Sequence, residues 1–281
     1  MLKCLAPAKI NLVLEVLGKR DDGYHEIRSL VQTISLCDVI SFELADVISL
    51  KCSEPSLQTS DNLVVQAAEL LRKVSGCQIG VKIKLEKRIP WGAGLGGGSS
   101  DAASTLLALK KLWKLELDTS DLIELAARLG SDVALFIHGG AALTEGRGEK
   151  VTPLTVSIPR WFVLLIPPLP KIPNKTQQLY SRLDARHFTD GNFVSTSVKS
   201  WSKDKHIASS LFYNVFDKVA FDAFPGLKTY WEHFAEVGAK EIHLAGSGPT
   251  LFAPVDGEAQ AKEMQRRLRR QKLEGYAVST I

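Results

Sequence analysis

A glycine-rich stretch around residues 90–104 constrains the fold of this chain more than any other part of the sequence. Five glycines fall within the seven positions Gly92–Gly98, and residues 90–100 are called the glycine loop below. Before the loop, residues 81–86 alternate apolar and charged side chains, which predicts a strand. After it, Ser99–Leu112 is rich in Ala and Leu, which predicts a helix. A strand, a glycine loop and a helix N-terminus direct free N–H groups and a positive dipole end at one point, which predicts an anion site, most often for phosphate.

Two common phosphate loops and a flexible linker are the alternatives for this stretch. Gly92, Gly94 and Gly97 satisfy the dinucleotide pattern G-x-G-x-x-G, but the preceding strand should then be apolar, and residues 82–88 are rich in charge. A Walker A loop ends in Gly-Lys-Ser/Thr, whereas this loop ends in Gly-Gly-Ser-Ser. A linker fits poorly, because Leu95 interrupts the glycines and a helix follows at once. We therefore expect a phosphate loop of a third kind.

The length and composition are typical of a globular protein with two domains. A chain of 281 residues exceeds the size at which a single core usually stops growing, and we place the domains at residues 1–154 and 155–281. The hydrophobic share of 45% and the charged share of 23% predict a substantial core. A net charge of +4 suits anionic small molecules without demanding nucleic acid.

The sequence carries no signal of secretion or membrane insertion. No charged-then-apolar segment opens it and no apolar run is long enough to span a bilayer, so we expect a cytoplasmic protein. The cysteines lack metal or redox spacing, which indicates buried reduced thiols at Cys4, Cys37, Cys52 and Cys77.

Periodicity and capping signals predict a mixed order of strands and helices. Strands are expected over Ala6–Gly18, Leu36–Cys52, Val81–Leu85, Gly139–Gly148, Trp161–Ile166 and Thr250–Pro254. Helices are expected after the capping residues 60–62, over Ser99–Leu112, after a cap at Ser120, and over Val133–Ile137, Asn174–Leu183, Ile207–Val219, Pro225–Val237 and Glu258–Lys272. The polar, poorly patterned residues 188–205 are expected to form a loop.

Several polar and aromatic residues suit a ligand site. Alternation places Lys9 and Asn11 on one face of the first strand, where they interrupt an apolar segment. Tyr24 and His25 suit stacking on and hydrogen bonding to a planar ligand, or packing at a domain edge. Thr176 and Tyr180 share a helix face, spaced i and i+4.

Three further features each have a simpler structural explanation. Asp132 is either the N-cap of the following helical turn or a carboxylate held near a phosphate site. The small residues Ala245–Pro249, called the second loop below, form at least a tight turn between strands. Basic residues over 266–272 are more often a solvated helix face than a nucleic-acid site.

Three stretches spread along the chain together resemble the GHMP kinase superfamily of small-molecule kinases. They are Pro7–Leu12, Pro90–Ser100 and Gly246–Thr250. Three motifs in this order are far more specific than any one of them. A narrower resemblance, to members that act on a cytidine-diphospho polyol, rests on Ala6–Asn11, Asp22–His25, Asp61–Leu63, Gly92–Ser100, Leu129–Val133 and Glu145–Glu149.

The resemblance implies an α+β fold with two domains, the first like domain 2 of ribosomal protein S5 and the second ferredoxin-like. It also implies ATP-dependent phosphorylation of a hydroxyl of the polyol. Lys9 and Asp132 would be the catalytic residues and would flank that hydroxyl. Asp132 would act as the base or as an orienting group, and Lys9 would offset the developing charge. Tyr24 and Tyr180 would sandwich the cytosine, and His25 would hydrogen-bond its edge.

The same resemblance assigns residues to the nucleotide and to the acceptor. Asn62 would lie near the adenine, and the ATP-binding set would be Asn62, Pro90, Gly92, Ala93, Gly94, Leu95, Gly96, Gly97, Gly98, Ser99 and Ser100. The substrate-binding set would be Asn11, Tyr24, His25, Thr176, Tyr180, Gly246 and Ser247. Mg²⁺ is expected to arrive with ATP, without an assigned side-chain ligand. We expect no nucleic-acid or membrane partner, and a monomer or weak homodimer.

Two alternatives remain open. Another GHMP kinase of the mevalonate or homoserine type is one, although its substrate would offer no base to Tyr24, His25 and Tyr180. An S5-like nucleic-acid-binding module using the last helix is the other, although binding alone would not require a carboxylate such as Asp132 near phosphates.

Overall fold

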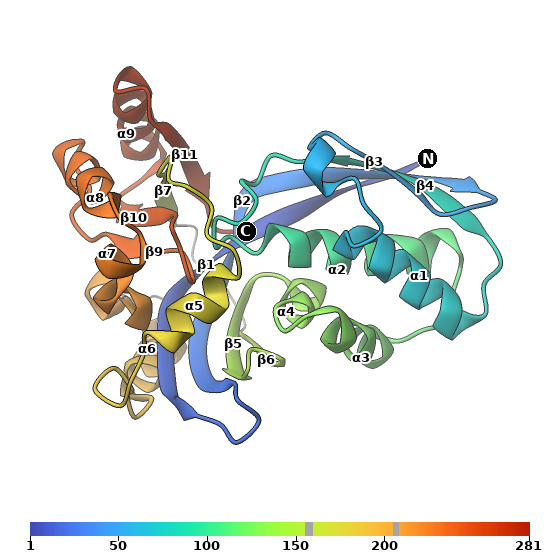
Figure 1. Cartoon of the computed structure of the whole chain (residues 1–281), viewed down its shortest axis with the longest axis horizontal. Helices are drawn as coiled ribbons and strands as arrows, with labels where there is room; N and C mark the ends of the chain where they lie inside the picture. The colour runs from blue at the N-terminus through green and yellow to red at the C-terminus, as the bar shows by residue number, and fades with distance from the viewer. Residues whose placement is uncertain (155–159, 205–207) are drawn as a thin grey trace. The chain divides into compact units, whose positions relative to one another are not determined.

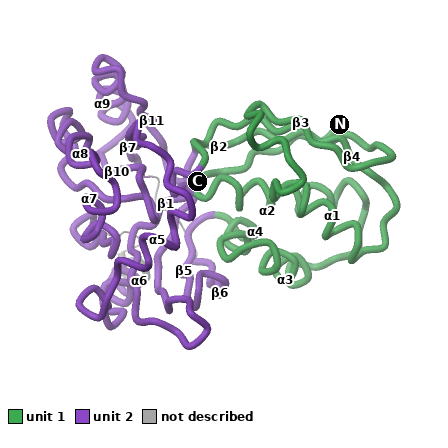
Figure 2. Tube along the Cα trace, in the orientation of Figure 1, with its two compact units in different colours: residues 1–8, 36–91, 96–139 green, residues 9–35, 92–95, 140–281 purple. Residues whose placement is uncertain are grey.

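The computed structural model describes residues 1–154, 160–204 and 208–281. The chain divides into two compact units that are not consecutive halves of the sequence (Figures 1 and 2). Unit 1 comprises residues 1–8, 36–91 and 96–139, and unit 2 comprises residues 9–35, 92–95 and 140–281. The domain division that we expect after residue 154 stays a prediction. It borders residues 155–159, which lie outside the described residues.

Unit 1 combines strands with four helices that pack against one another. The strands are β1 (Leu2–Lys19) and β2 (His25–Ala45), which both continue into unit 2, with β3 (Ser49–Cys52) and β4 (Gly80–Glu86). The helices are α1 (Leu63–Ser75), α2 (Gly97–Leu112), α3 (Thr119–Leu129) and α4 (Val133–His138), and a 3₁₀ turn spans Pro55–Leu57.

The alternation expected in β4 is confirmed. Val81, Ile83 and Leu85 are buried, whereas Lys82 and Lys84 are exposed. The strand pairs antiparallel with β2 and parallel with β3. One face of the strand therefore contributes to the core of unit 1, and the strand delivers the chain to the glycine loop from a fixed direction.

Unit 2 contains the remaining parts of β1 and β2 and a second sheet. Its other strands are β5 (Ala141–Gly146), β6 (Lys150–Leu154), β7 (Trp161–Ile166), β8 (Tyr213–Asn214), β9 (His243–Leu244), β10 (Leu251–Val255) and β11 (Glu274–Ser279). Its helices are α5 (Lys175–Ser181), α6 (Asn192–Asp204), α7 (Ala220–Ala223), α8 (Leu227–Glu236) and α9 (Glu258–Arg270), with 3₁₀ turns at Ser209–Leu211 and Val215–Lys218.

The second sheet has the strand order β11-β7-β10-β9, and all its pairings are antiparallel. Helix α8 lies between β7 and β9 in the chain, and α9 lies between β10 and β11. This β-α-β-β-α-β order is the ferredoxin-like arrangement. The expected ferredoxin-like C-terminal architecture is therefore confirmed, and β7 occupies the bounds predicted for it.

Helix α6 corrects the expected loop over residues 188–205. Its N-terminal end is held by the buried carboxylate of Glu15 on β1, which accepts hydrogen bonds from the N–H groups of Phe193 at 3.4 Å and Val194 at 2.7 Å. Val194 and Ser197 are fully buried. The local Asp190 carboxylate also accepts from the Asn192 N–H, at 3.1 Å, but two N–H groups of the first turn depend on a partner almost 180 residues away in sequence.

The helix expected over residues 207–219 is also wrong in the part that the structure describes, which begins at residue 208. A 3₁₀ turn, the short strand β8 and a second 3₁₀ turn occupy this segment. β8 pairs in parallel with β1, placing Tyr213 opposite Val13 and Asn214 opposite Leu14. Strand pairing with a distant element overrides the local helical pattern here.

The start of α3 shows a cap different from the expected Ser120. Asp118 accepts a hydrogen bond from the Asp121 N–H at 2.9 Å, and the Asp121 carboxylate accepts one from the Asp118 N–H at 2.7 Å. This reciprocal pair is a capping box. The Ser120 hydroxyl only donates to the Asp118 carboxylate.

We expect Asp118→Ala to lower the free energy of unfolding by about 1 kcal/mol, because it leaves a helix N–H without its acceptor. Ser120→Ala, the matched control, should cost less, since it removes no cap. Urea denaturation measures both values. An equal or larger loss for Ser120→Ala would contradict the assignment of the cap.

Candidate functional site

The glycine loop connects β4 to α2, as the sequence predicts. The chain passes from unit 1 into unit 2 at Gly92 and returns at Gly96. Gly92, Gly94 and Gly96 have φ angles of 75°, 90° and 71°, in the left-handed region that favours glycine. Gly96 is the N-cap of α2, a helix of 16 residues, so free N–H groups and the positive dipole end lie at the end of the loop. The strand–loop–helix arrangement is confirmed, and its nucleotide contacts stay predictions.

Lys9 and Asn11 share a face of β1, as the alternation predicts. Lys9 Nζ donates to Asn11 Oδ1 at 2.7 Å, and Asn11 Nδ2 donates to Ser29 Oγ at 2.8 Å. The Ser29 hydroxyl donates in turn to the Val13 carbonyl at 2.6 Å. Lys9 is 7% exposed and Asn11 is 6% exposed, so Lys9 is not a solvated surface lysine. Buried polar groups need such partners, and this chain of hydrogen bonds orients the lysine.

The two loops of small residues meet backbone to backbone within unit 2. A Cβ atom on Gly94 would lie 2.1 Å from the Ala245 carbonyl oxygen. A Cβ atom on Gly246 would lie 3.0 Å from Lys9 Nζ and 3.2 Å from Asn11 Oδ1. The second loop is therefore more than a turn, because its backbone adjoins both the glycine loop and the polar pair of β1.

Helix α5 approaches the same loops through two adjacent residues. Thr176 Oγ1 and Ser247 Oγ are joined by a hydrogen bond of 3.1 Å. Lys175 Nζ donates to the carbonyl of Gly92 at 3.0 Å and to the carbonyl of Gly248. No motif or periodicity in the sequence marks Lys175 as a functional residue. Its place directly before the predicted Thr176 was the available signal.

The predicted aromatic residues of unit 2 make two separate contacts. Tyr180 stacks on His25, with ring centroids 4.9 Å apart and an interplanar angle of 26°. Tyr24 is exposed, and the Arg147 guanidinium lies 4.9 Å from its ring centroid. Burial, and then the charge of Lys19, lower the pKa of His25, so its imidazole is neutral at physiological pH and both donates and accepts hydrogen bonds.

Asn62 and Asp132 lie in unit 1, each at the start of a helix. Asn62 Oδ1 accepts from the Val64 N–H at 2.9 Å and Asn62 Nδ2 donates to the Leu57 carbonyl at 2.8 Å, so Asn62 caps α1. Asp132 occupies the N-cap position of α4, but its side chain does not cap that helix. The capping interpretation of Asp132 is therefore wrong, and its catalytic interpretation stays a prediction.

A buried ion cluster in unit 1 brackets the glycine loop, and no local sequence pattern predicts it. Lys87 Nζ donates to the carboxylate of Asp38 and, at 2.7 Å, to that of Asp101. Asp38 Oδ1 accepts from the N–H groups of Arg88 at 2.5 Å and Ile89 at 2.8 Å. The three charged side chains are at most 7% exposed. Because Lys87 precedes the loop and Asp101 follows it, the cluster ties the two ends of the loop together.

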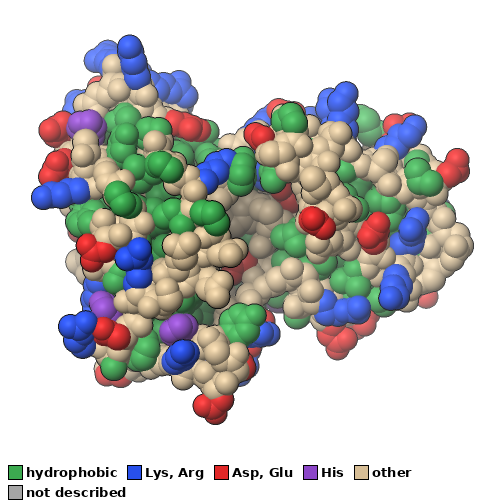
Figure 3. Space-filling model, viewed as in Figure 1, with side chains coloured by type: hydrophobic (Ala, Val, Ile, Leu, Met, Phe, Trp, Pro, Cys, Tyr) green, Lys and Arg blue, Asp and Glu red, His purple; other side chains and the backbone are tan. Residues whose placement is uncertain are grey.

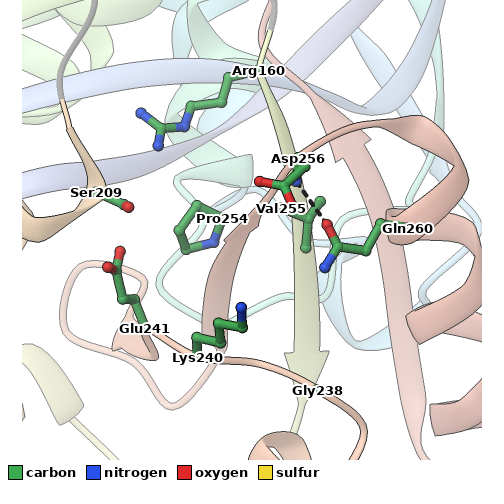
Figure 4. Close-up of a pocket in the computed structure, with 9 residues that line it drawn as sticks. All are labelled: Arg160, Ser209, Gly238, Lys240, Glu241, Pro254, Val255, Asp256 and Gln260. Atoms are coloured by element: carbon green, nitrogen blue, oxygen red, sulfur yellow. Dashed lines mark hydrogen bonds between the residues drawn. The ribbon is translucent and has the colours of Figure 1, made fainter.

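A cavity of about 130 Å³ lies elsewhere on unit 2 (Figure 4). Among its lining residues are Arg160 and Lys240, and opposite charges come from Glu241 and Asp256. None of the described residues that line it belongs to the predicted catalytic, nucleotide or substrate sets. The cavity is therefore separate from the residues predicted to carry the chemistry.

The basic residues of α9 form a solvated helix face, as their simpler interpretation predicts. Figure 3 shows Lys and Arg side chains gathered over this helix. The Glu263 carboxylate lies 2.7 Å from Arg266 and 3.0 Å from Arg267, so part of the positive charge is paired within the helix. The buried residues of α9 are Ala261, Met264 and Leu268.

Metal ligands, membrane-spanning helices and disulfides bear on the expected chemistry. No cluster of three or more His, Cys, Asp or Glu side chains among the described residues is placed to hold a metal ion. None of the described helices combines the length and the apolar character needed to cross a membrane. All four cysteines have free thiols.

An alanine in a left-handed conformation costs about 1–2 kcal/mol. Gly94→Ala should lower the free energy of unfolding by more than this, because the new methyl group would also collide with the Ala245 carbonyl. Gly92→Ala is the matched control: φ is also positive there, but a Cβ would meet nothing within 4 Å. Thermal and urea unfolding of both variants measure the difference. Equal losses of stability would contradict the close approach of the two loops.

Burial raises the pKa of Asp101 to about 7, against the opposing charge of Lys87. Between pH 3.8, the ordinary pKa of an aspartate, and about pH 7, the folded protein keeps this proton while the unfolded chain loses it. The contribution of Asp101 to stability therefore falls as the pH rises through this range. Asp101→Asn stays neutral and still accepts a hydrogen bond from Lys87.

The Asp101→Asn variant should consequently be more stable than the native protein at pH 8, and this advantage should disappear near pH 4. Urea unfolding at several pH values measures it, with the exposed Asp222→Asn as control. A stability difference that does not change with pH would contradict the raised pKa.

Comparisons with known proteins agree with this fold and loop arrangement. The family models described as GHMP kinases N terminal domain and GHMP kinases C terminal match residues 62–140 and 195–274. The chain is 44% identical to the 4-diphosphocytidyl-2-C-methyl-D-erythritol kinase of Dehalococcoides mccartyi, over 100% of this chain and 99% of that protein.

Solved structures extend the comparison. A crystal structure of 4-(cytidine 5'-diphospho)-2C-methyl-D-erythritol kinase is similar with a TM-score of 0.85 and 35% identity over 99% of each chain. A homoserine kinase from Cytophaga hutchinsonii reaches a TM-score of 0.74 at 18% identity, over 100% of this chain and 94% of that one, which is a likeness of fold alone. The α+β fold expected from the sequence is thereby confirmed, and the chain belongs to the GHMP kinase family.

Proposed function

We propose that this protein is a kinase that transfers the γ-phosphoryl group of ATP to the 2-hydroxyl of 4-diphosphocytidyl-2-C-methyl-D-erythritol, a step of the non-mevalonate isoprenoid pathway. The observation that carries the proposal is 44% identity, along essentially the whole of both chains, with a kinase named for this substrate. The buried pair Lys9–Asn11 beside two backbone loops supports it, because phosphoryl transfer depends on positioned cations and N–H donors.

The nucleotide phosphates are assigned to the glycine loop and the start of α2. Free N–H groups at a helix N-terminus bind anions, and the glycines permit a close approach of the backbone. Asn62 is assigned to the region of the adenine, with its own polar atoms already engaged in capping α1. Mg²⁺ would accompany ATP and offset phosphate charge, and the proposed step requires no protein ligand for it.

The proposed chemical step is a direct displacement at phosphorus. The acceptor oxygen bonds to the γ-phosphorus while the bond from that phosphorus to the bridging oxygen of ADP breaks. The hydroxyl proton passes to the Asp132 carboxylate late in the reaction, so Asp132 chiefly orients the hydroxyl. Lys9, held by Asn11, offsets the negative charge that develops on the transferring group.

The acceptor's cytosine is assigned to Tyr24, His25 and Tyr180. A neutral His25 matches the cytosine edge, which presents both a hydrogen-bond donor and acceptors. The stacked pair of His25 and Tyr180 provides an aromatic surface of the kind that binds a base. The remainder of the acceptor is assigned to Asn11, Thr176, Gly246 and Ser247. The hydrogen bond between Thr176 and Ser247 places their hydroxyls at the second loop.

Measuring ATP consumption with Mg²⁺ and different acceptors tests the function. Turnover with the cytidine-diphospho substrate, and none with mevalonate, homoserine or no acceptor, is the expected result. Turnover only with mevalonate or homoserine would replace the acceptor within the same kinase family. Salt-dependent binding of RNA without any turnover would overturn the kinase proposal in favour of a nucleic-acid-binding module.

We expect Asp132→Asn to lower kcat by about 10²–10⁴-fold with little change in either KM, because the amide neither orients the hydroxyl as the carboxylate does nor accepts its proton late in the reaction. Steady-state kinetics with the cytidine substrate measures the effect, and the exposed Asp222→Asn is a control for the loss of one carboxylate charge. Near-normal turnover in a folded Asp132→Asn protein would remove Asp132 from the mechanism.

A further inference from the structure

Lys175 joins the two loops of unit 2 through their backbones. It is the first residue of α5, and its ammonium donates to the carbonyl of Gly92 in the glycine loop at 3.0 Å and to the carbonyl of Gly248 in the second loop. An ammonium has three donors in a flexible arrangement, so one lysine can serve acceptors on two separate segments. The side chain therefore acts as a bridge between loops that are far apart in the sequence.

The bridge crosses a place where the backbone is otherwise free to turn. Gly92 has a positive φ angle of 75°, and a residue without a Cβ can rotate its peptide plane at little cost. Gly248, with a φ angle of 64°, is more restricted, because the ring of Pro249 limits the peptide that follows it. Neighbouring residues are fixed differently: the Leu95 carbonyl accepts from the Lys9 N–H at 2.9 Å. The Gly92 carbonyl is thus held by a side chain, that of Lys175, whereas the Leu95 carbonyl is held by the backbone N–H of a strand residue, Lys9.

The direction of these carbonyls matters for an anion. A phosphate loop works when its N–H groups face the anion, and a carbonyl oxygen turned the same way would repel it. A cation that engages the Gly92 carbonyl on its own side keeps the Gly92–Ala93 peptide in the orientation that exposes the Ala93 N–H. The Gly248 carbonyl shares its peptide with Pro249, which has no N–H, so it serves as the anchor of the bridge. The ammonium also offsets the partial negative charge of the two oxygens.

Holding a lysine here is costly in free energy, which is unusual for a purely structural contact. Burial first, and then the positive charge of Lys9, lower the pKa of Lys175 to about 7. An apolar side chain of similar length would fill the space without that cost. A lysine is favoured over such a residue where a negatively charged ligand is present for part of the time.

We propose that Lys175 is a positioning residue for phosphoryl transfer, which is anchored on the Gly248 carbonyl of the second loop and orients the Gly92–Ala93 peptide of the glycine loop for the phosphates of ATP. The proposal rests on the proposed kinase function and adds to it a residue that neither the motifs nor the family models single out. Lys175 acts through the Gly92 and Gly248 carbonyls and need not touch the reacting atoms.

Lys175→Met tests the proposal, because methionine keeps most of the side-chain length and removes the ammonium. We expect KM for ATP to rise about tenfold, the loss typical of a charged hydrogen bond, with kcat reduced and KM for the cytidine substrate unchanged. Lys228→Met is the matched control, since Lys228 lies on α8 with a side chain 74% exposed. Lys175→Arg, which restores a cation with several donors, should recover most of the ATP affinity.

Each other outcome separates this role from a simpler one. If Lys175→Met lowers the melting temperature but the folded enzyme keeps its KM for ATP, Lys175 is a structural bridge and the proposal is wrong. If Lys175→Arg recovers nothing while Lys175→Met is impaired, a specific contact of the ammonium, rather than loop orientation, explains the loss, and the proposal is also overturned.

Binding of a non-hydrolysable ATP analogue, measured by titration calorimetry, keeps this test independent of the acceptor. Should the native protein fail to phosphorylate the cytidine substrate, the proposed function would fall, yet weaker binding of the analogue to Lys175→Met than to Lys228→Met would still support the positioning role. Equal binding to both variants would reject the role whatever the acceptor is.

Discussion

The main-chain contact between the glycine loop and the second loop is the constraint on which the site of unit 2 depends. At Gly94 a side chain would begin 2.1 Å from the Ala245 carbonyl, so the contact exists only because both segments are built from small residues. Gly246 brings the same backbone to Lys9 and Asn11. Groups set by main-chain contacts are positioned more rigidly than groups on rotatable side chains, and phosphoryl transfer gains mostly from such positioning.

Two lysines, one buried and one half-buried, complete this arrangement within each unit. In unit 1, Lys87 lies between the carboxylates of Asp38 and Asp101 and ties the chain before the glycine loop to the helix after it. In unit 2, Lys175 engages two backbone carbonyls instead of a carboxylate. Burying charge costs free energy that an apolar residue would not, so both lysines are better explained by the geometry they impose on the loop than by stability alone.

The proposed chemistry follows from these parts without any covalent role for the protein. A loop of N–H donors, a lysine oriented by Asn11 and a carboxylate on Asp132 are what transfer of a phosphoryl group to a hydroxyl requires. Specificity for a cytidine compound would come from a different region, where His25 and Tyr180 stack and Tyr24 faces Arg147. Separation of the reacting groups from the base-binding groups lets related kinases share a fold while using different acceptors.

The sequence alone determined the parts whose signal is local: the alternation of β4, the glycine loop, α2, the bounds of β7 and the shared face of Lys9 and Asn11 on β1. These follow from side-chain periodicity and from the freedom of glycine, which neighbouring residues alone determine. Tertiary structure decided the rest. Helix α6 is held by Glu15, β8 by its pairing with β1, and Lys175 acquires its role from carbonyls more than 70 residues away. A polar side chain shows its function only once folding has placed its partner within hydrogen-bond distance, and no local pattern encodes that distance.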